Sequence, residues 1–154
     1  MDEDTEFFLS ELEKKHGGEL TWRTFSTWYG CSDGIQRQFG VFLFKVFDTF
    51  HFEDFEKKST MFGIAIGNNS GKRKNKKQFI KMERSFAKDD IIDIKTTTRS
   101  IANTVIRTGN TIPIKAAGGF DKVFRKLVTA VTLKDGTIHF FELIAPKEFV
   151  EESK

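Results

Sequence analysis

Cysteine, proline and long apolar runs are scarce in this chain of 154 residues. The single cysteine, Cys31, excludes an internal disulfide and a cysteine-rich zinc site, and it fits a reducing compartment. The densest apolar run, residues 39–47, spans about nine residues and contains Lys45, whereas a helix needs roughly twenty to cross a bilayer. The first residues are acidic where a secretion signal is basic and then apolar. We therefore expect a cytoplasmic protein without a transmembrane segment.

Phenylalanine is the abundant aromatic residue, with 18 copies against one tyrosine and two tryptophans. Because Phe adds apolar bulk without a polar group, most of these rings should lie in a core, and any left outside would form an adhesive surface. Apolar residues make up 38% of the chain and charged residues 31%, a balance typical of a globular domain. No linker is visible, so we expect an N-terminal amphipathic helix in residues 1–19 and a single β-rich domain in residues 20–154.

The order of periodic segments predicts a mostly β protein of the α+β class, with an N-terminal helix and a short C-terminal helix. Two antiparallel sheets or a partly closed barrel would both accommodate the strands. Residues 48–58 carry Phe among charged residues, which favours a short helix over an irregular loop. The predicted helices cover residues 4–16 and 147–152, and the predicted strands cover residues 21–29, 35–47, 60–67, 78–86, 91–97, 101–108 and 111–116.

Two strand predictions are specific enough to test. Residues 41–47 place apolar side chains on both faces, which indicates a central strand covered on both sides. Residues 135–136 are Asp-Gly, which predicts a two-residue type I′ turn. That turn would pair Leu133 with Ile138, Val131 with Phe140 and Leu127 with Ile144, and would put all six side chains on one apolar face.

Residues that bind phosphate or metal are present, but their spacing is wrong for known sites. The segment Gly67 to Lys72 has only three residues between its glycines and is followed by Arg73, so it is not a P-loop. The acidic clusters in residues 53–56 and 89–93 lack the pattern of a calcium loop. The histidines show no metal-ligand spacing; they are His16, His51 and His139. We therefore expect no cofactor and no metal.

Catalysis is not indicated either. Cys31 lies in a Gly-Cys-Ser-Asp-Gly stretch that is typical of a tight turn, and no histidine stands beside it in a nucleophile signature. The sequence therefore favours a protein that is not an enzyme. An enzyme of unrecognised type is the least favoured alternative, and a deep pocket near Cys31 that contains a histidine would support it.

One segment departs strongly from the average charge. Residues 72–88 carry eight basic side chains and one acidic side chain, a net charge of +7, whereas the whole chain carries +3. Residues 1–19 carry seven acidic and two basic side chains, a net charge of −5. A chain polarised in this way attracts a polyanion to one end, unless its own acidic helix neutralises the basic tip. The predicted anion-binding residues are Lys72, Arg73, Lys74, Lys76, Lys77, Lys81 and Arg84.

The order of elements over residues 20–152 resembles the pleckstrin-homology-like superfold of the bacterial PH or GRAM type. The segments that carry the resemblance are Lys-Gln-Phe-Ile-Lys-Met-Glu-Arg at 77–84, Asp-Ile-Ile-Asp-Ile at 90–94 and Val-Thr-Leu-Lys-Asp-Gly at 131–136. In phosphoinositide-binding members, basic residues of an early hairpin hold inositol phosphates. The resemblance implies that role for residues 72–77 with Lys81 and Arg84, although other members bind peptides or proteins.

The sequence thus favours a non-enzymatic binding or scaffold domain whose basic hairpin tip contacts an acidic protein, a phosphoinositide headgroup or a membrane face. Nucleic acid is disfavoured because no aromatic rings are interleaved in the basic run. The alternative is a structural or assembly protein, such as a phage component or a homo-oligomer subunit. That alternative would use exposed rings at Phe47, Phe50, Phe52 and Phe55.

Overall fold

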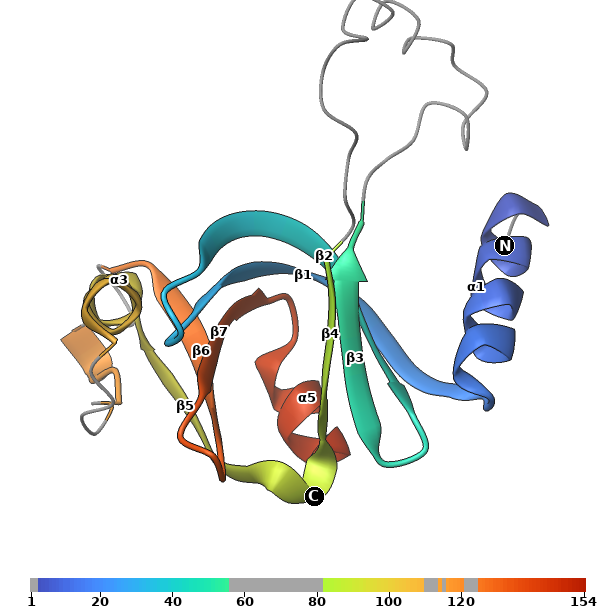
Figure 1. Cartoon of the computed structure of the whole chain (residues 1–154). Coiled ribbons are helices and arrows are strands. Elements are labelled where there is room, and N and C mark those ends of the chain that lie inside the picture. The colour runs from blue at the N-terminus through green and yellow to red at the C-terminus, as the bar shows by residue number, and fades with distance from the viewer. Residues whose placement is uncertain (1–2, 56–81, 110–113, 115, 121–124) are drawn as a thin grey trace, which may run out of the picture.

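The structure of the protein is a computed structural model that describes residues 3–55, 82–109, 114, 116–120 and 125–154 (Figure 1). In chain order, the elements whose bounds are described are α1 (Glu3–His16), β1 (Leu20–Cys31), β2 (Gln36–Val46), β3 (Thr49–Asp54), β4 (Glu83–Ala87), the 3-10 helix η3 (Lys88–Asp90), β5 (Ile91–Thr98), α3 (Arg99–Thr108), β6 (Leu127–Leu133), β7 (Ile138–Leu143) and α5 (Pro146–Glu152). The predicted N-terminal and C-terminal helices and the mostly β character are confirmed.

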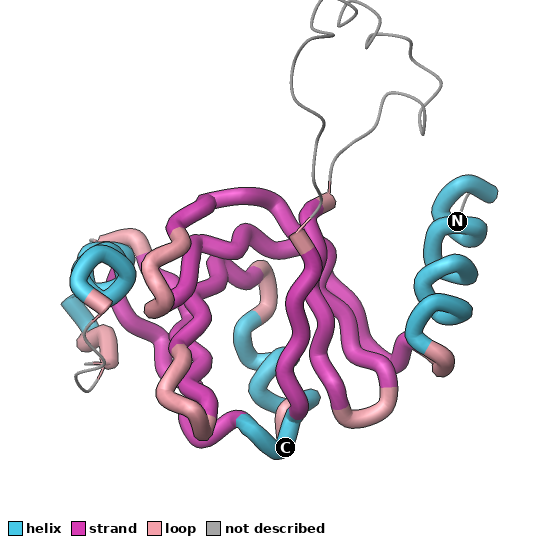
Figure 2. The backbone as a smooth tube through the Cα atoms, viewed as in Figure 1, coloured by secondary structure: helices cyan, strands magenta, loops and turns pink. Residues whose placement is uncertain are grey.

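The seven strands form one antiparallel sheet in the order β4-β3-β2-β1-β7-β6-β5. This sheet curls into a half-barrel (Figure 2). Strand β1 belongs to both halves, because it pairs with β2 along most of its length and with β7 from Ser26 onward. The expected antiparallel β architecture is therefore present as a single curled sheet, and the division into two sheets is not seen in the described strands.

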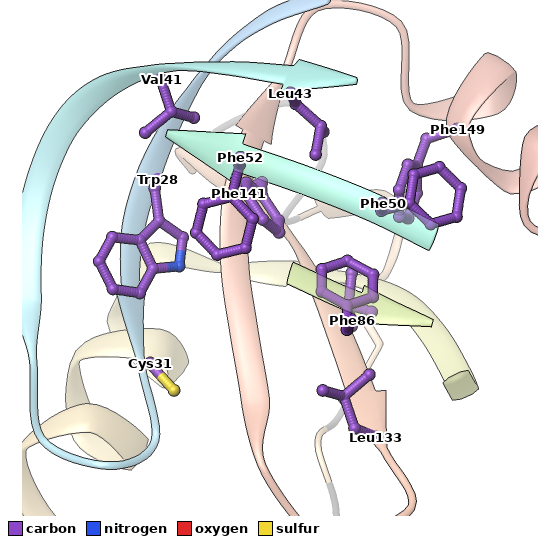
Figure 3. Close-up of a cluster of buried hydrophobic side chains, with 11 residues drawn as sticks. Trp28, Cys31, Val41, Leu43, Phe50, Phe52, Phe86, Leu133, Phe141 and Phe149 are labelled. Carbon is purple, nitrogen blue, oxygen red and sulfur yellow. The ribbon is translucent and has the colours of Figure 1, made fainter. Parts of the chain in front are cut away.

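The hollow of the half-barrel holds the main core (Figure 3). Helix α5 lies inside the curl, where its Phe149 ring packs 4.9 Å from the ring of Phe50 and 5.9 Å from that of Trp22. The buried members of this core come from six strands and α5; they are Trp28, Cys31, Val41, Leu43, Phe50, Phe52, Phe86, Val131, Leu133, Phe141 and Phe149.

The outer face of the sheet carries two further helices, α1 and α3, at separate places (Figure 1). Helix α1 packs Phe8, Leu9 and Leu12 on an apolar patch of β2, which consists of Phe42, Phe44 and Val46. Helix α3 covers a second patch that includes Tyr29, Val128, Ala130, Ile138 and Phe140. Side chains of β2 thus pack on both faces, as predicted, except that Phe47 turns outward after the strand and is 68% exposed.

Two predicted elements are wrong in type. The expected helix over residues 48–58 contains the strand β3, in which Phe50 and Phe52 face the hollow while His51 faces outward. The expected strand over residues 101–108 lies within α3. The Thr98 hydroxyl caps that helix by accepting a hydrogen bond from the Ile101 amide at 3.3 Å, and its apolar residues recur at helical spacing.

The final hairpin forms, but its register differs by one residue from the prediction. Val131 pairs with His139 and Ala130 with Phe140. The reason is the turn: the Gly136 amide donates to the Leu133 carbonyl at 2.9 Å, and Gly136 has a φ of 92°. These features define a three-residue loop with a glycine bulge, so the apolar residues divide between the two faces of the sheet.

Some predicted strands lie outside the described residues. They are the strand at 60–67, the first part of the strand at 78–86 and most of the strand at 111–116.

Candidate functional site

The base of the connection between β3 and β4 is held by one buried carboxylate. Asp54 has a fully buried side chain whose Oδ2 accepts hydrogen bonds from Arg37 Nη2 at 2.8 Å and from the Met82 amide at 3.0 Å. The Asp54 amide in turn donates to the Met82 carbonyl at 3.0 Å. Asp54 and Met82, which flank the undescribed basic connection, residues 56–81, are therefore fixed side by side at one end of the sheet.

Six of the seven predicted anion-binding residues lie outside the described residues: Lys72, Arg73, Lys74, Lys76, Lys77 and Lys81. The seventh, Arg84, lies on β4 and its guanidinium is already engaged. Its Nη2 is 3.2 Å from Asp33 Oδ2, and its Cζ lies 5.1 Å from the centre of the Trp28 ring. Arg84 thus links β4 to the turn between β1 and β2 across the hollow, which is a structural role that the sequence did not indicate.

The acidic end of α1 lies at the same end of the sheet as Asp54. The ring of His16 lies 4.1 Å from that of His51, whereas the ring of Phe8 lies 6.2 Å from that of Phe55. Helix α1 therefore runs antiparallel to β3, and the residues before Phe8 extend past the end of that strand. Three acidic side chains occupy this first turn, namely Glu3, Asp4 and Glu6.

A cavity of about 200 Å³ lies beside the contact between the last turn of α1 and strands β3 and β4. It is lined by His16, His51, Phe52, Glu53, Glu83, Arg84 and Ser85. Lys15 Nζ lies 2.8 Å from Glu83 Oε2 and 4.0 Å from Glu53 Oε1, so an ammonium group neutralises part of the acidic wall. The Nε2 atom of His16 is buried and has no hydrogen-bond partner.

Burial, the His16 ring and Lys15 together lower the pKa of His51 to about 4. A cation within a few ångströms disfavours a second positive charge, so the His51 imidazole is neutral at neutral pH. No pattern in the sequence indicated this pair, because the two histidines are far apart in the chain and come together only when α1 packs on the sheet.

Cys31 and His139 are the groups that a thiol-dependent enzyme would use. They face each other as register partners of β1 and β7, and both are buried. Burial raises the pKa of the Cys31 thiol, and burial together with Arg84 lowers the pKa of His139 to about 4. Both shifts favour the neutral forms, whereas a catalytic cysteine needs a stabilised thiolate. The Nδ1 atom of His139 instead accepts a hydrogen bond from Trp28 Nε1 at 3.3 Å.

The neighbouring Asp33 carboxylate stays ionised. Partial burial acts to raise its pKa, but the Ile35 amide and Arg84 outweigh that effect and lower it. Asp33 and Arg84 therefore form an ion pair at the rim of the hollow. This ion pair supports a structural role for both residues and for the neighbouring Cys31 and His139.

The proposed aromatic interface must be corrected. Phe50 and Phe52 are fully buried in the hollow and are not available to a partner. Phe55 is half-buried, with its ring 4.8 Å from that of Phe25. Only Phe47 stands well exposed among the four. The sequence could not separate these rings, because the assignment of β3 decides which of them turn inward.

No group of three or more His, Cys, Asp or Glu side chains has the geometry to hold a metal ion in the part of the chain that is described. None of the helices described is long and apolar enough to span a membrane.

Comparison with known proteins gives no match among family models, curated proteins or solved structures. The function is therefore argued from the chain itself.

Proposed function

We propose that this protein is a non-enzymatic binding module whose β3–β4 connection contacts an anionic partner. The observation that carries the proposal is the distribution of charge. Residues 56–81 contain eight basic side chains and one acidic side chain, a net charge of +7, and the remainder of the chain carries a net charge of −4. Such a field attracts an anionic surface to one end of the molecule.

The geometry of the described residues supports this reading. Asp54 and Met82, the described residues that flank the basic connection, are hydrogen-bonded to each other, and Arg37 also holds the Asp54 carboxylate. Basic side chains in one connection act together on a flat anionic partner, whereas the same number of basic side chains scattered over the surface would not. The partner would be an acidic protein, a phosphoinositide headgroup or a membrane face.

The resemblance to the pleckstrin-homology-like superfold is part of the same proposal. Two antiparallel meanders, β1–β4 and β5–β7, are joined by the pairing of β1 with β7, and a C-terminal helix lies in the hollow of the curl; this arrangement supports the resemblance. In that superfold a basic hairpin holds inositol phosphates in some members, and residues 72–77 with Lys81 are the candidates here. Arg84 is engaged with Asp33, so we assign it to the support of β4.

The test exchanges Lys72, Arg73, Lys74, Lys76 and Lys77 for Gln together. Each basic residue near an anionic surface contributes about 1 kcal/mol, so binding should weaken by more than about 100-fold. Binding is measured by sedimentation with phosphatidylserine vesicles, with phosphoinositide vesicles and with neutral phosphatidylcholine vesicles, and by anisotropy with a polyglutamate peptide. Preference among these probes identifies the class of partner. Binding should also fall steeply as salt is raised.

A matched control removes the same charge elsewhere. Exchange of Lys14, Arg107, Lys126, Lys134 and Lys147 for Gln changes five exposed basic residues and leaves the connection intact. This control should retain most of the binding. Equal loss in both variants would point to net charge alone, and undiminished binding in the first variant would overturn the proposal. Exchange of Glu3, Asp4 and Glu6 for Gln should strengthen binding, because these carboxylates repel the same partner.

A further inference from the structure

The contact between α1 and the sheet contains a pair of imidazoles in direct contact. The rings of His16 and His51 lie 4.1 Å apart and are tilted, with an interplanar angle of 41°. The Phe44 ring lies beside both, 5.2 Å from the His16 ring and 5.3 Å from the His51 ring. The pair therefore forms part of the apolar interface that holds the last turn of α1 in place.

The charged groups around the pair come from three elements. Helix α1 supplies Lys15, strand β3 supplies Glu53, and strand β4 supplies Glu83. Arg84 also lines the cavity, but its guanidinium is directed to Asp33 and Trp28 in the hollow. Strand β2 contributes the ring of Phe44, which contacts both imidazoles. Because Lys15 already lies beside both carboxylates, they do not offer an unopposed partner to a second imidazolium.

We propose that His16 and His51 form an acid-sensitive latch, which holds α1 on the outer face of the sheet at neutral pH and releases it in acid, when His51 takes up a proton. Release returns the His51 imidazole to water. It also uncovers the apolar patch of Phe42, Phe44 and Val46, which α1 covers in the closed state. This device is independent of the basic connection and of the function proposed above.

The size of the effect follows from proton linkage. The pKa of His51 is about 4 in the closed state, and release of α1 returns it toward its ordinary value of 6.5. Lowering the pH from 7 to 5 should then raise the equilibrium constant for opening of α1 roughly 20-fold. Most carboxylates remain ionised in this range, so the acid response is assigned to the histidine.

Hydrogen exchange followed by mass spectrometry on the full chain measures this opening. Protection of the α1 amides, corrected for the intrinsic exchange rate at each pH, should fall roughly 20-fold between pH 7 and pH 5. The exchange of α1 should stay faster than that of β6 and β7, because release is local. Binding of the dye ANS should rise over the same range as the apolar patch is uncovered.

Three variants decide the outcome. His51→Phe keeps an aromatic ring beside Phe44 but cannot take a proton, so the pH dependence of α1 exchange should disappear. His16→Gln should weaken that dependence, and it serves if His51→Phe folds poorly. His139→Gln removes the other histidine whose pKa is about 4 but lies in the hollow, so the dependence should remain.

The proposal is overturned if the α1 amides show the same protection at both pH values in the parent chain. It is also overturned if His51→Phe retains the parent response, or if α1 exchanges at the rate of β6 and β7 throughout, because the helix would then open only with the whole molecule.

Discussion

Gly30 lies where β1 changes its register with both neighbouring strands. Its φ is 156°, and an added Cβ would stand 2.6 Å from the carbonyl oxygen of Ile35 and 2.7 Å from Cδ1 of Ile106. The first of these neighbours is backbone and cannot move aside without breaking the turn between β1 and β2. The glycine therefore permits a bulge in β1, which pairs with β2 on one side and with β7 on the other.

Gly30→Ala should lower the free energy of unfolding by about 2 kcal/mol or more, since it adds both a clash and backbone strain. Urea denaturation followed by tryptophan fluorescence measures the change. Gly40→Ala is the matched control on the adjacent strand, because an added Cβ there meets nothing within 4 Å. That control should change stability by less than about 0.5 kcal/mol. Equal effects of the two substitutions would contradict the role given to Gly30.

At the residue scale, the abundance of Phe correctly indicated an aromatic core. Phe50 and Phe52 belong to that core, although the sequence placed them at an exposed interface. The sequence could not show which polar side chains contact one another. The contacts of Arg84 with Asp33 and of His16 with His51 depend on how the sheet curls and where α1 packs. The basic residues of the connection remain a prediction from sequence alone.

At the scale of elements, the sequence predicted the correct secondary structure where a single hydrophobic periodicity dominated a segment. Helix α1 and the Pro-initiated helix α5 were predicted, and so was the strand β2 that is covered on both faces. Residues 101–108 were mistaken for a strand because Ile, Val and Thr favour strands, whereas a Thr98 cap and an apolar stripe at helical spacing prevail. The register of the last hairpin depended on one loop residue, which sequence could not resolve.

Helix α5 packs in the hollow of the sheet mainly through the side chain of Phe149. Phe149→Ala should cost about 3 to 4 kcal/mol, because the ring is fully buried against Trp22 and Phe50 and its removal leaves a cavity. Urea unfolding measures the loss, and the fluorescence of Trp22 should report the repacking in the native state. Val150→Ala on the same helix is the control, since that side chain is 36% exposed and should cost less than about 1 kcal/mol. Similar costs for both would show that α5 contributes by its backbone rather than by this ring.

At the scale of the whole molecule, stability depends on pH through buried histidine. His139 is 4% exposed, and its pKa is about 4 in the folded chain against 6.5 for an exposed histidine. Between these values the unfolded chain binds the proton and the folded chain does not. The contribution is therefore complete above pH 6.5 and is lost as the pH falls toward 4. His51 acts in the same direction.

We expect the parent chain to lose about 2 kcal/mol of stability between pH 7 and pH 4.5 through His139 alone. His139→Gln keeps a hydrogen-bond acceptor for Trp28 Nε1 and should remove this part of the pH dependence, even if the variant is less stable at pH 7. Chemical denaturation at both pH values measures the difference. A variant whose stability falls with acid as steeply as that of the parent would show that His139 is not the titrating group.

The sharing of β1 between the two halves of the sheet has a kinetic consequence. The pairing of β1 with β2 joins strands that are adjacent in the sequence. In contrast, the Ser26 hydroxyl of β1 donates to the carbonyl of Glu142, 116 residues away. Closing so large a loop costs more entropy than closing a hairpin, and it must occur before the hollow can be sealed. The β1–β2, β2–β3 and β6–β7 hairpins form from local contacts. We therefore expect the meeting of β1 with β7 to limit the folding rate more than these hairpins do.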